Sequence, residues 1–154
     1  MWRTTSSNTL STPPLRPPRW RCAAALTNAR RVRTDEPAAL ARAQTTAAAA
    51  AGKAGEQILI LDLRGQTLIT DFFVICTTTS RVHMRAVREG IEEAMAASRH
   101  RLWAREGNEE AQWVLLDYGD VIVHLMSDER RAYYKLERMW HGATEVPLPH
   151  VPPG

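Results

Sequence analysis

Two apolar runs flank the segment Asp-Tyr-Gly-Asp within residues 112–126, which read QWVLLDYGDVIVHLM. The branched aliphatic residues on both sides favour β-strands, and Gly119 supplies the positive φ that a tight turn requires. The pattern therefore predicts a β-hairpin in which Tyr118 and Gly119 form a two-residue loop.

Alternate side chains of a hairpin lie on opposite faces, so this register defines two surfaces. The first is wholly aliphatic and is expected to be core, and it consists of Val114, Leu116, Val121, Val123 and Leu125. The second carries three pairs of opposed residues, Asp117 with Asp120, Leu115 with Ile122 and Trp113 with His124, followed by Met126. Because the second surface mixes aromatic, apolar and acidic side chains, we expect it to be available for a partner.

Capping residues and apolar runs predict further elements before the hairpin. A Thr-Asp-Glu-Pro sequence at 34–37 begins an Ala-rich helix, and Gly52 ends it. Near-continuous apolar runs at 57–63 and 72–77 predict strands that are buried on both faces.

Helices are also predicted on both sides of the hairpin. Ser80 caps a helix over residues 81–98, and residues 101–105 re-enter the sheet as a strand. The inward stripe of that helix is Val87, Ile91, Ala94 and Met95. A last helix begins at 127–128 and ends at Gly142. Its predicted inward residues are Ala132, Leu136, Met139 and Trp140.

The order α-β-β-α-β-β-β-α predicts an α/β domain, with a mixed sheet of about five strands and helices packed against it. The domain is expected to span residues 35–142, and a Pro-rich tail without helix or strand follows over residues 143–154. A chain of 154 residues is long enough for one such domain with a hydrophobic core.

Charge is distributed unevenly along the chain, whose formal net charge is +3. Residues 1–34 contain seven Arg and no acidic residue, whereas residues 35–154 carry 13 basic and 17 acidic side chains. The first segment is predicted to be disordered, and it fits either an organellar transit peptide or a start codon assigned too far upstream. The acidic balance of the rest argues against a phosphate-binding surface across the whole domain.

The cysteines and the hydropathy indicate a reducing compartment and no membrane span. Cys22 lies in the basic first segment, and Cys76 lies within an apolar strand pattern, which predicts a buried thiol instead of a disulfide. No apolar run approaches the roughly 18 residues that a transmembrane helix needs.

Acidic residues at predicted strand ends could hold Mg²⁺ for nucleotidyl transfer. They are Asp62, Asp71, Asp117 and Asp120, and His124 follows the last two. A nucleotidyltransferase also needs alternating acids on one strand and a Gly-Ser loop, and the sequence has neither. Phosphate-loop, dinucleotide, zinc-protease and nucleophile-elbow motifs are absent as well. We therefore predict no catalytic residue, no metal ligand and no cofactor.

Three blocks and their spacing resemble the Iojap family of ribosomal silencing factors: DFFVICTTTS at 71–80, WVLLDYGDVIVHLM at 113–126 and RAYYKLERMW at 131–140. The resemblance covers roughly residues 38–141. It implies a fold similar to that of nucleotidyltransferases but without their catalytic acids. Residues 1–34 have no counterpart in the family, and the first helix is unusually rich in Ala.

The resemblance also implies a translational repressor that binds the large ribosomal subunit through ribosomal protein fourteen of that subunit. Bound where the small subunit docks, such a protein blocks subunit joining in the bacterial cytoplasm when nutrients are short. Organellar relatives act in the assembly of mitochondrial or chloroplast ribosomes, which is the alternative if residues 1–34 are a transit peptide. A nucleotidyltransferase is the less favoured alternative. A homodimer and a secondary contact with ribosomal RNA are compatible with the resemblance.

On this interpretation the partner-binding residues lie on the hairpin and are Trp113, Asp117, Tyr118, Asp120, His124 and Met126. Trp113 is the expected anchor, because large aromatic residues dominate protein interfaces, and Met126 adds an adaptable contact. Tyr118 lies at the tip of the predicted turn, and the two acids are expected to pair with basic residues of the partner. The alternative for Trp113 is core packing under the last helix.

Overall fold

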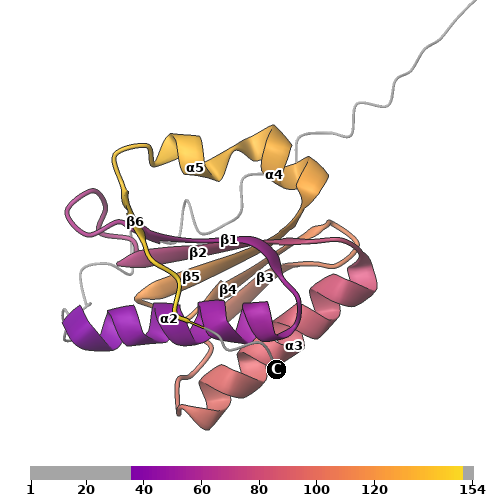
Figure 1. Cartoon of the computed structure of the whole chain (residues 1–154), viewed down its shortest axis with the longest axis horizontal. Coiled ribbons are helices and arrows are strands. Elements are labelled where there is room, and N and C mark those ends of the chain that lie inside the picture. Colours follow the sequence, from indigo (N-terminus) through magenta and orange to yellow (C-terminus); the bar gives the residue numbers. More distant parts are fainter. Residues whose placement is uncertain (1–35, 151–154) are drawn as a thin grey trace, which may run out of the picture.

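The structure, a computed structural model, describes residues 36–150 and has three layers (Figure 1). One outer layer contains helices α2 (Glu36–Gly52) and α3 (Arg81–Ala97). The opposite outer layer contains the shorter helices α4 (Asp128–Tyr134) and α5 (Leu136–Met139), and a β-sheet lies between the two layers. The predicted α/β class is confirmed.

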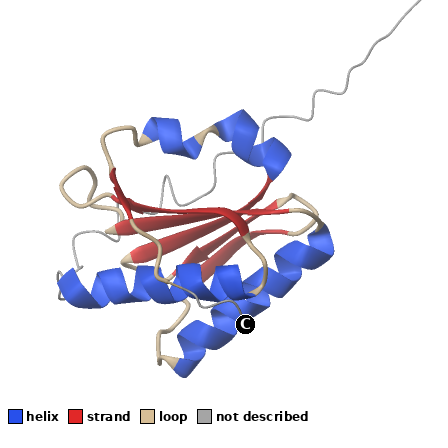
Figure 2. Ribbon diagram, viewed as in Figure 1, coloured by secondary structure: helices blue, strands red, loops and turns tan. Residues whose placement is uncertain are grey.

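Six strands form one mixed sheet (Figure 2). In chain order they are β1 (Glu56–Asp62), β2 (Phe72–Thr78), β3 (Ala104–Asn108), β4 (Trp113–Asp117), β5 (Val121–Ser127) and β6 (Thr144–Val146). Across the sheet their order is β3-β4-β5-β2-β1-β6. The central β2–β5 pair is parallel, and the other pairs are antiparallel.

Each face of the sheet has its own hydrophobic core, and the hairpin strands contribute to both. The face under α2 and α3 contains the aliphatic set that the alternation predicts, Val114, Leu116, Val121, Val123 and Leu125. The face under α4 and α5 contains Trp113, Leu115, Ile122 and Met126, together with Phe73 and Leu136. The predicted division of the hairpin side chains between two faces is confirmed.

The alanines of α2 let this helix approach the sheet closely. Four of them, at intervals of three or four residues, are 0–2% exposed: Ala39, Ala43, Ala47 and Ala50. Just after the helix, a Cβ on Gly55 would lie 2.5 Å from Sγ of Cys76, so only glycine fits against β2 here. Cys76 is a buried free thiol, as predicted, and burial raises its pKa to about 12.

The hairpin turn lies one residue later than predicted. Gly119 and Asp120 form its loop, because the Tyr118 N–H donates to the Val121 carbonyl at 2.9 Å and extends the ladder. Gly119 has a φ of +93° at the first loop position, where a type II′ turn places glycine. The observed opposite pairs are Trp113 with Met126, Leu115 with His124 and Asp117 with Ile122. The register therefore shifts by two residues, and the side chains of β4 and β5 keep their predicted faces, whereas Asp120 leaves the ladder for the loop.

The last predicted helix is broken at Lys135, whose φ of 46° is left-handed, so α4 and α5 are separate helices. The break changes the inward stripe. Leu136 and Trp140 pack toward the sheet as predicted, whereas Ala132 and Met139 are exposed, contrary to the prediction.

The segment predicted as a tail contains a strand, because β6 pairs with β1 and sets Val146 opposite Ile60. The prediction that no strand follows residue 143 is therefore wrong. A strand of three residues beside a Pro-rich segment is too short to show the alternation of apolar and polar residues that identifies a strand in a sequence. The strand predicted at 101–105 is also displaced, because β3 covers residues 104–108. Predictions for residues 1–34, including Cys22 and the first helix cap, lie outside the described residues.

Candidate functional site

Trp113 and His124 form a hydrogen-bonded pair on the α4–α5 side of the sheet. The Trp113 Nε1–H donates to His124 Nδ1 at 3.2 Å. His124 is 0% exposed, and burial lowers its pKa to about 3, so the ring is neutral and Nδ1 can accept. The rings of Phe73 and His124 form a T-shaped contact with a centroid distance of 4.7 Å. The pair is thus an apolar packing unit with one internal hydrogen bond.

The hairpin face predicted to be open is covered by α4 and α5 (Figure 1). Trp113 is 8% exposed and Met126 is 0% exposed. The side chains that cover the face are Tyr134, Leu136 and Trp140. The expected availability of this face is therefore wrong, because hydrophobic residues of the last two helices bury it. A contribution of Trp113, His124 or Met126 to partner binding stays a prediction.

Tyr118 lies in the opposite core instead of at an exposed turn tip. It is 5% exposed and packs among the residues under α2 and α3. Burial, reinforced by the charge of Glu92, raises the pKa of the Tyr118 hydroxyl to about 12. The displaced turn explains the difference, because it places Tyr118 in the β-ladder.

The two acids of the turn have partners within the chain. Asp117 Oδ1 accepts the Gly119 N–H at 2.7 Å, and Asp120, 7% exposed, forms an ion pair with Arg42 of α2. Arg42 Nε also donates to His100 Nδ1 at 3.1 Å. Burial, and secondarily the Arg42 charge, lowers the pKa of His100. Sequence reasoning missed Arg42 because it lies 78 residues from Asp120.

The remaining strand-end acids take part in local structure. Arg64 binds Asp62 at 2.6 Å, and this side-chain hydrogen bond is the main cause of the lowered pKa of Asp62. The backbone N–H of Asp71 donates to the Asp120 carbonyl at 3.0 Å. Within residues 36–150, no group of three or more His, Cys, Asp or Glu side chains is arranged to hold a metal ion.

Arg131 fastens α4 to the sheet, and the sequence pattern does not single it out. Its Nη1 donates to the Gln57 carbonyl and to Thr77 Oγ1, the latter at 2.9 Å, and its Nε binds Glu137 at 2.9 Å. Gln57 has a φ of 45°, where the pairing of β1 with β2 is irregular. The buried guanidinium thus satisfies a strained part of β1 and links it to both short helices.

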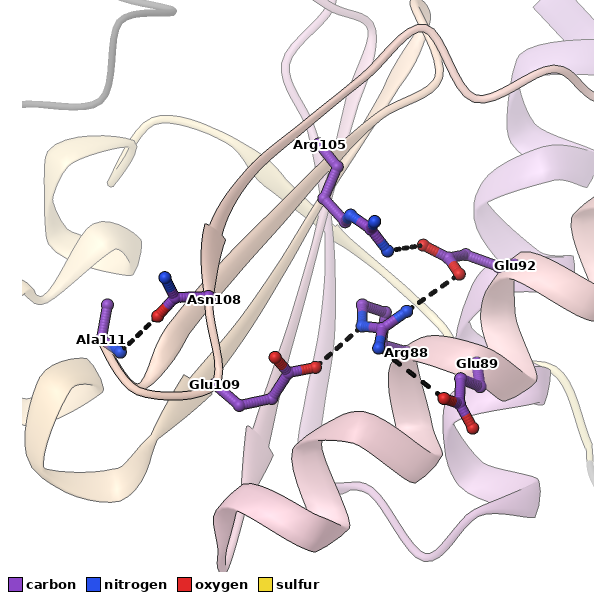
Figure 3. A network of polar contacts seen from close by, with 7 residues as sticks. All are labelled: Arg88, Glu89, Glu92, Arg105, Asn108, Glu109 and Ala111. Carbon is purple, nitrogen blue, oxygen red and sulfur yellow. Dashed lines mark hydrogen bonds and ion pairs between the residues drawn. The ribbon is translucent and has the colours of Figure 1, made fainter.

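A charged network joins α3 to the β3–β4 hairpin (Figure 3). Arg88 binds Glu92 at 3.1 Å, as expected for an i,i+4 pair, and Glu109 at 2.9 Å. Arg105 of β3 binds Glu92 as well, at 3.1 Å. Arg88 lies outside the predicted inward stripe of α3, yet its side chain is only 13% exposed because Glu109 of the β3–β4 turn packs against it. The network fixes the edge of the sheet against α3.

The exposed apolar side chains mark the surface that remains for partners. Large hydrophobic residues that are at least 48% exposed are Leu68, Val82, Trp103, Tyr133, Met139 and Leu148. Two of them, Tyr133 and Met139, belong to α4 and α5. None of the described helices is both long enough and apolar enough to cross a bilayer.

Comparison with known proteins gives one consistent group of relatives. A family model described as "Ribosomal silencing factor during starvation" (RsfS) matches residues 36–153. The chain is 38% identical over 99 residues to the ribosomal silencing factor RsfS of Halalkalibacterium halodurans, covering 64% of this chain and 85% of that protein. It is 30% identical over 115 residues to the chloroplastic protein Iojap of Zea mays, covering 75% of this chain and 50% of that protein.

A solved structure from Bacillus halodurans has the same fold. It superposes with a TM-score of 0.60 at 35% identity and covers 68% of this chain and 95% of that chain. The residues matched by the family model enclose every helix and strand from α2 to β6.

Proposed function

Because the chain belongs to the ribosomal silencing factor family, we propose that it binds the large ribosomal subunit through ribosomal protein fourteen of that subunit. Bound on the face where the small subunit docks, it blocks subunit joining and represses translation. The observation that carries the proposal is that the family match spans all three layers of the domain instead of a single motif.

The contact surface that we propose is the outer face of α4 and α5. Tyr133 is 70% exposed there, and Met139 is 48% exposed. A chain of aromatic contacts connects this surface to the hairpin, since Trp113 packs on Tyr134 at 4.7 Å and Tyr134 packs on Tyr133 at 5.0 Å between ring centroids. Trp113 therefore acts on the partner through the rings above it.

The other predicted partner residues take supporting positions in this proposal. His124 orients Trp113 through its hydrogen bond, and Met126 packs below the same helices. Tyr118 and Asp120 are buried and stabilise the turn instead of contacting the partner. The carboxylate of Asp120 is already paired with Arg42. Asp117 is the partly exposed member of the set, and we propose that it faces basic residues of the partner.

Sedimentation with separated ribosomal subunits tests the function. The full chain should co-sediment with large subunits and not with small subunits or joined ribosomes. Tyr133→Ala should weaken binding to large subunits by about 2 kcal/mol, roughly 30-fold, because it removes an exposed aromatic anchor. Val82→Ala is the matched control, since Val82 is 81% exposed on α3 in the other layer. Equal binding to joined ribosomes would exclude a site between the subunits.

An organellar setting is the second candidate, and the similarity to a chloroplastic Iojap protein favours it. In that case the chain acts in the assembly of the large organellar subunit. Sedimentation with large subunits from chloroplasts or mitochondria, beside bacterial ones, distinguishes the settings. Preference for an organellar subunit would support the second candidate.

A further inference from the structure

The segment that connects α3 to β3 combines exposed cations with an exposed aromatic ring. Residues 99–105 read RHRLWAR and contain three Arg, one Trp and no acid. Trp103 is 59% exposed, and the Arg105 side chain is 49% exposed. Arg99 and Arg101 are exposed as well. We call residues 99–105 the arginine–tryptophan segment.

The backbone of this segment is held rigidly by the residues between the exposed ones. Leu102 packs against the core under α2 and α3, and His100 accepts a hydrogen bond from Arg42. The Trp103 N–H donates to the Asp117 carbonyl at 2.8 Å. The indole lies over the hairpin turn, because a Cβ on Gly119 would lie 3.1–3.3 Å from its ring atoms. Trp103 is thus presented to solvent by a fixed scaffold.

Several carboxylates of α3 and the β3–β4 turn are paired with arginines. Glu92 and Glu109 belong to the network of Arg88, and Glu110 binds Arg81 at 2.6 Å. Within residues 36–150, neither Arg99 nor Arg101 forms an ion pair. The positive charges of Arg99 and Arg101 are therefore not cancelled by an ion pair within the described residues, whereas Arg105 is paired with Glu92. The domain as a whole is acidic.

We propose that the arginine–tryptophan segment binds single-stranded or looped RNA. Arg99 and Arg101 neutralise phosphates, and Trp103 stacks on a base. Arg101 and Trp103 directly precede β3, which begins at Ala104, so a cation and a ring lie two residues apart in the chain. The choice of RNA rests on the proposed function, because the large ribosomal subunit contains single-stranded and looped RNA.

The test measures RNA binding without the ribosome. Fluorescence anisotropy with a labelled oligouridine of about 12 nucleotides suits a site of this size. Trp103→Ala in the full chain should weaken binding about tenfold, and Trp103→Phe should retain most of it because the ring still stacks. The double variant Arg99→Gln with Arg101→Gln should weaken binding and lower the slope of log affinity against log salt by about 1–2.

Matched controls distinguish a specific effect of the arginine–tryptophan segment on RNA binding from a loss of overall positive charge and from misfolding. Arg138→Gln removes one arginine charge, and Tyr133→Ala removes an exposed ring, both from the opposite outer layer. Both controls should bind oligouridine as the wild type does. Circular-dichroism melting should show unchanged midpoints for Trp103→Phe and for the double arginine variant. Loss of affinity in Trp103→Phe equal to that in Trp103→Ala, with unchanged folding, would overturn stacking.

Several outcomes would overturn the proposal as a whole. These are no binding of oligouridine by the wild type, equal weakening by the controls, or displacement of oligouridine by polyglutamate as readily as by unlabelled RNA. The proposed function fails separately. If the wild type does not bind large subunits but binds RNA through Trp103, the RNA site is supported and the proposed ribosomal function is refuted. If the wild type binds large subunits and the variants of the arginine–tryptophan segment have unchanged RNA affinity, only the proposed RNA site is refuted.

Discussion

The indole of Trp113 is enclosed between the neutral ring of His124 and the ring of Tyr134, so its polar and apolar parts are both satisfied. A buried aromatic residue of this kind stabilises the fold through area, packing and one hydrogen bond. The large side chain of Trp113 suggests an interface anchor when only the sequence is considered. In the structure, most of its surface packs against other residues of the same chain.

Trp113→Ala should therefore destabilise the protein strongly. The cavity left by the indole should lower the free energy of unfolding by about 3–5 kcal/mol. The melting midpoint should fall by about 10 °C or more, measured by circular dichroism. Affinity for large subunits should also fall, because Tyr134 and Tyr133 lose their support. Val123→Ala, in the other core, should lower stability and leave the affinity of the folded fraction intact. A Trp113→Ala protein with a normal midpoint would contradict core packing.

His124 should make stability depend on pH. Its pKa is about 3 in the folded protein and about 6.5 in an unfolded chain, so the unfolded state takes up the proton first as the pH falls. The free energy of unfolding should decrease by about 2 kcal/mol between pH 7 and pH 5. Urea unfolding at both pH values of wild type and His124→Gln measures the effect. His100, whose pKa is also lowered, contributes with the same sign, so His100→Gln is the comparison.

At the scale of elements, helix α4 has only seven residues and depends on tertiary contacts for its position. Ser127 caps it, within the predicted start at 127–128, by accepting the Arg130 N–H at 3.2 Å. The cap defines where α4 begins, but Arg131 defines where it lies, through bonds to β1 and β2. Capping is local and can be predicted, whereas the partners of Arg131 are 54 and 74 residues away.

Arg131→Ala should loosen α4 and α5 without unfolding α2 and α3. Loss of a charged donor to two buried oxygens should cost about 2–3 kcal/mol. Hydrogen exchange of amides in α4 and α5 should accelerate, while amides of α3 change little. Arg138→Ala, an exposed arginine of α5, is the control and should leave exchange unaltered. Uniform acceleration across all helices would show that Arg131 supports the whole fold instead of one layer.

At the scale of the whole molecule, two helical layers cover both faces of one sheet, and the strand-end acids are engaged within this frame. Asp62 is bound by Arg64, and Asp120 is bound by Arg42. Within residues 36–150, these acids form no group that could hold a metal ion.

The chain should accordingly show no nucleotidyl transfer. Incubation with each nucleoside triphosphate and Mg²⁺ should release no pyrophosphate, and these ligands should not raise the melting midpoint. Asp62→Asn and Asp120→Asn should therefore alter stability without altering any turnover. Pyrophosphate release that depends on Mg²⁺ and is lost in either variant would refute this expectation.

The amino-acid sequence alone determined the α/β class, the capping of α3 by Ser80 and the division of the hairpin into two faces, because these depend on periodicity and on neighbours along the chain. The tertiary structure decided which surfaces are open. Burial of Trp113 requires α4 and α5 to fold back over β4 and β5, and the ion pair of Asp120 requires α2 to meet the hairpin turn. Such contacts join residues far apart in sequence, and neither alternation nor helical spacing specifies them.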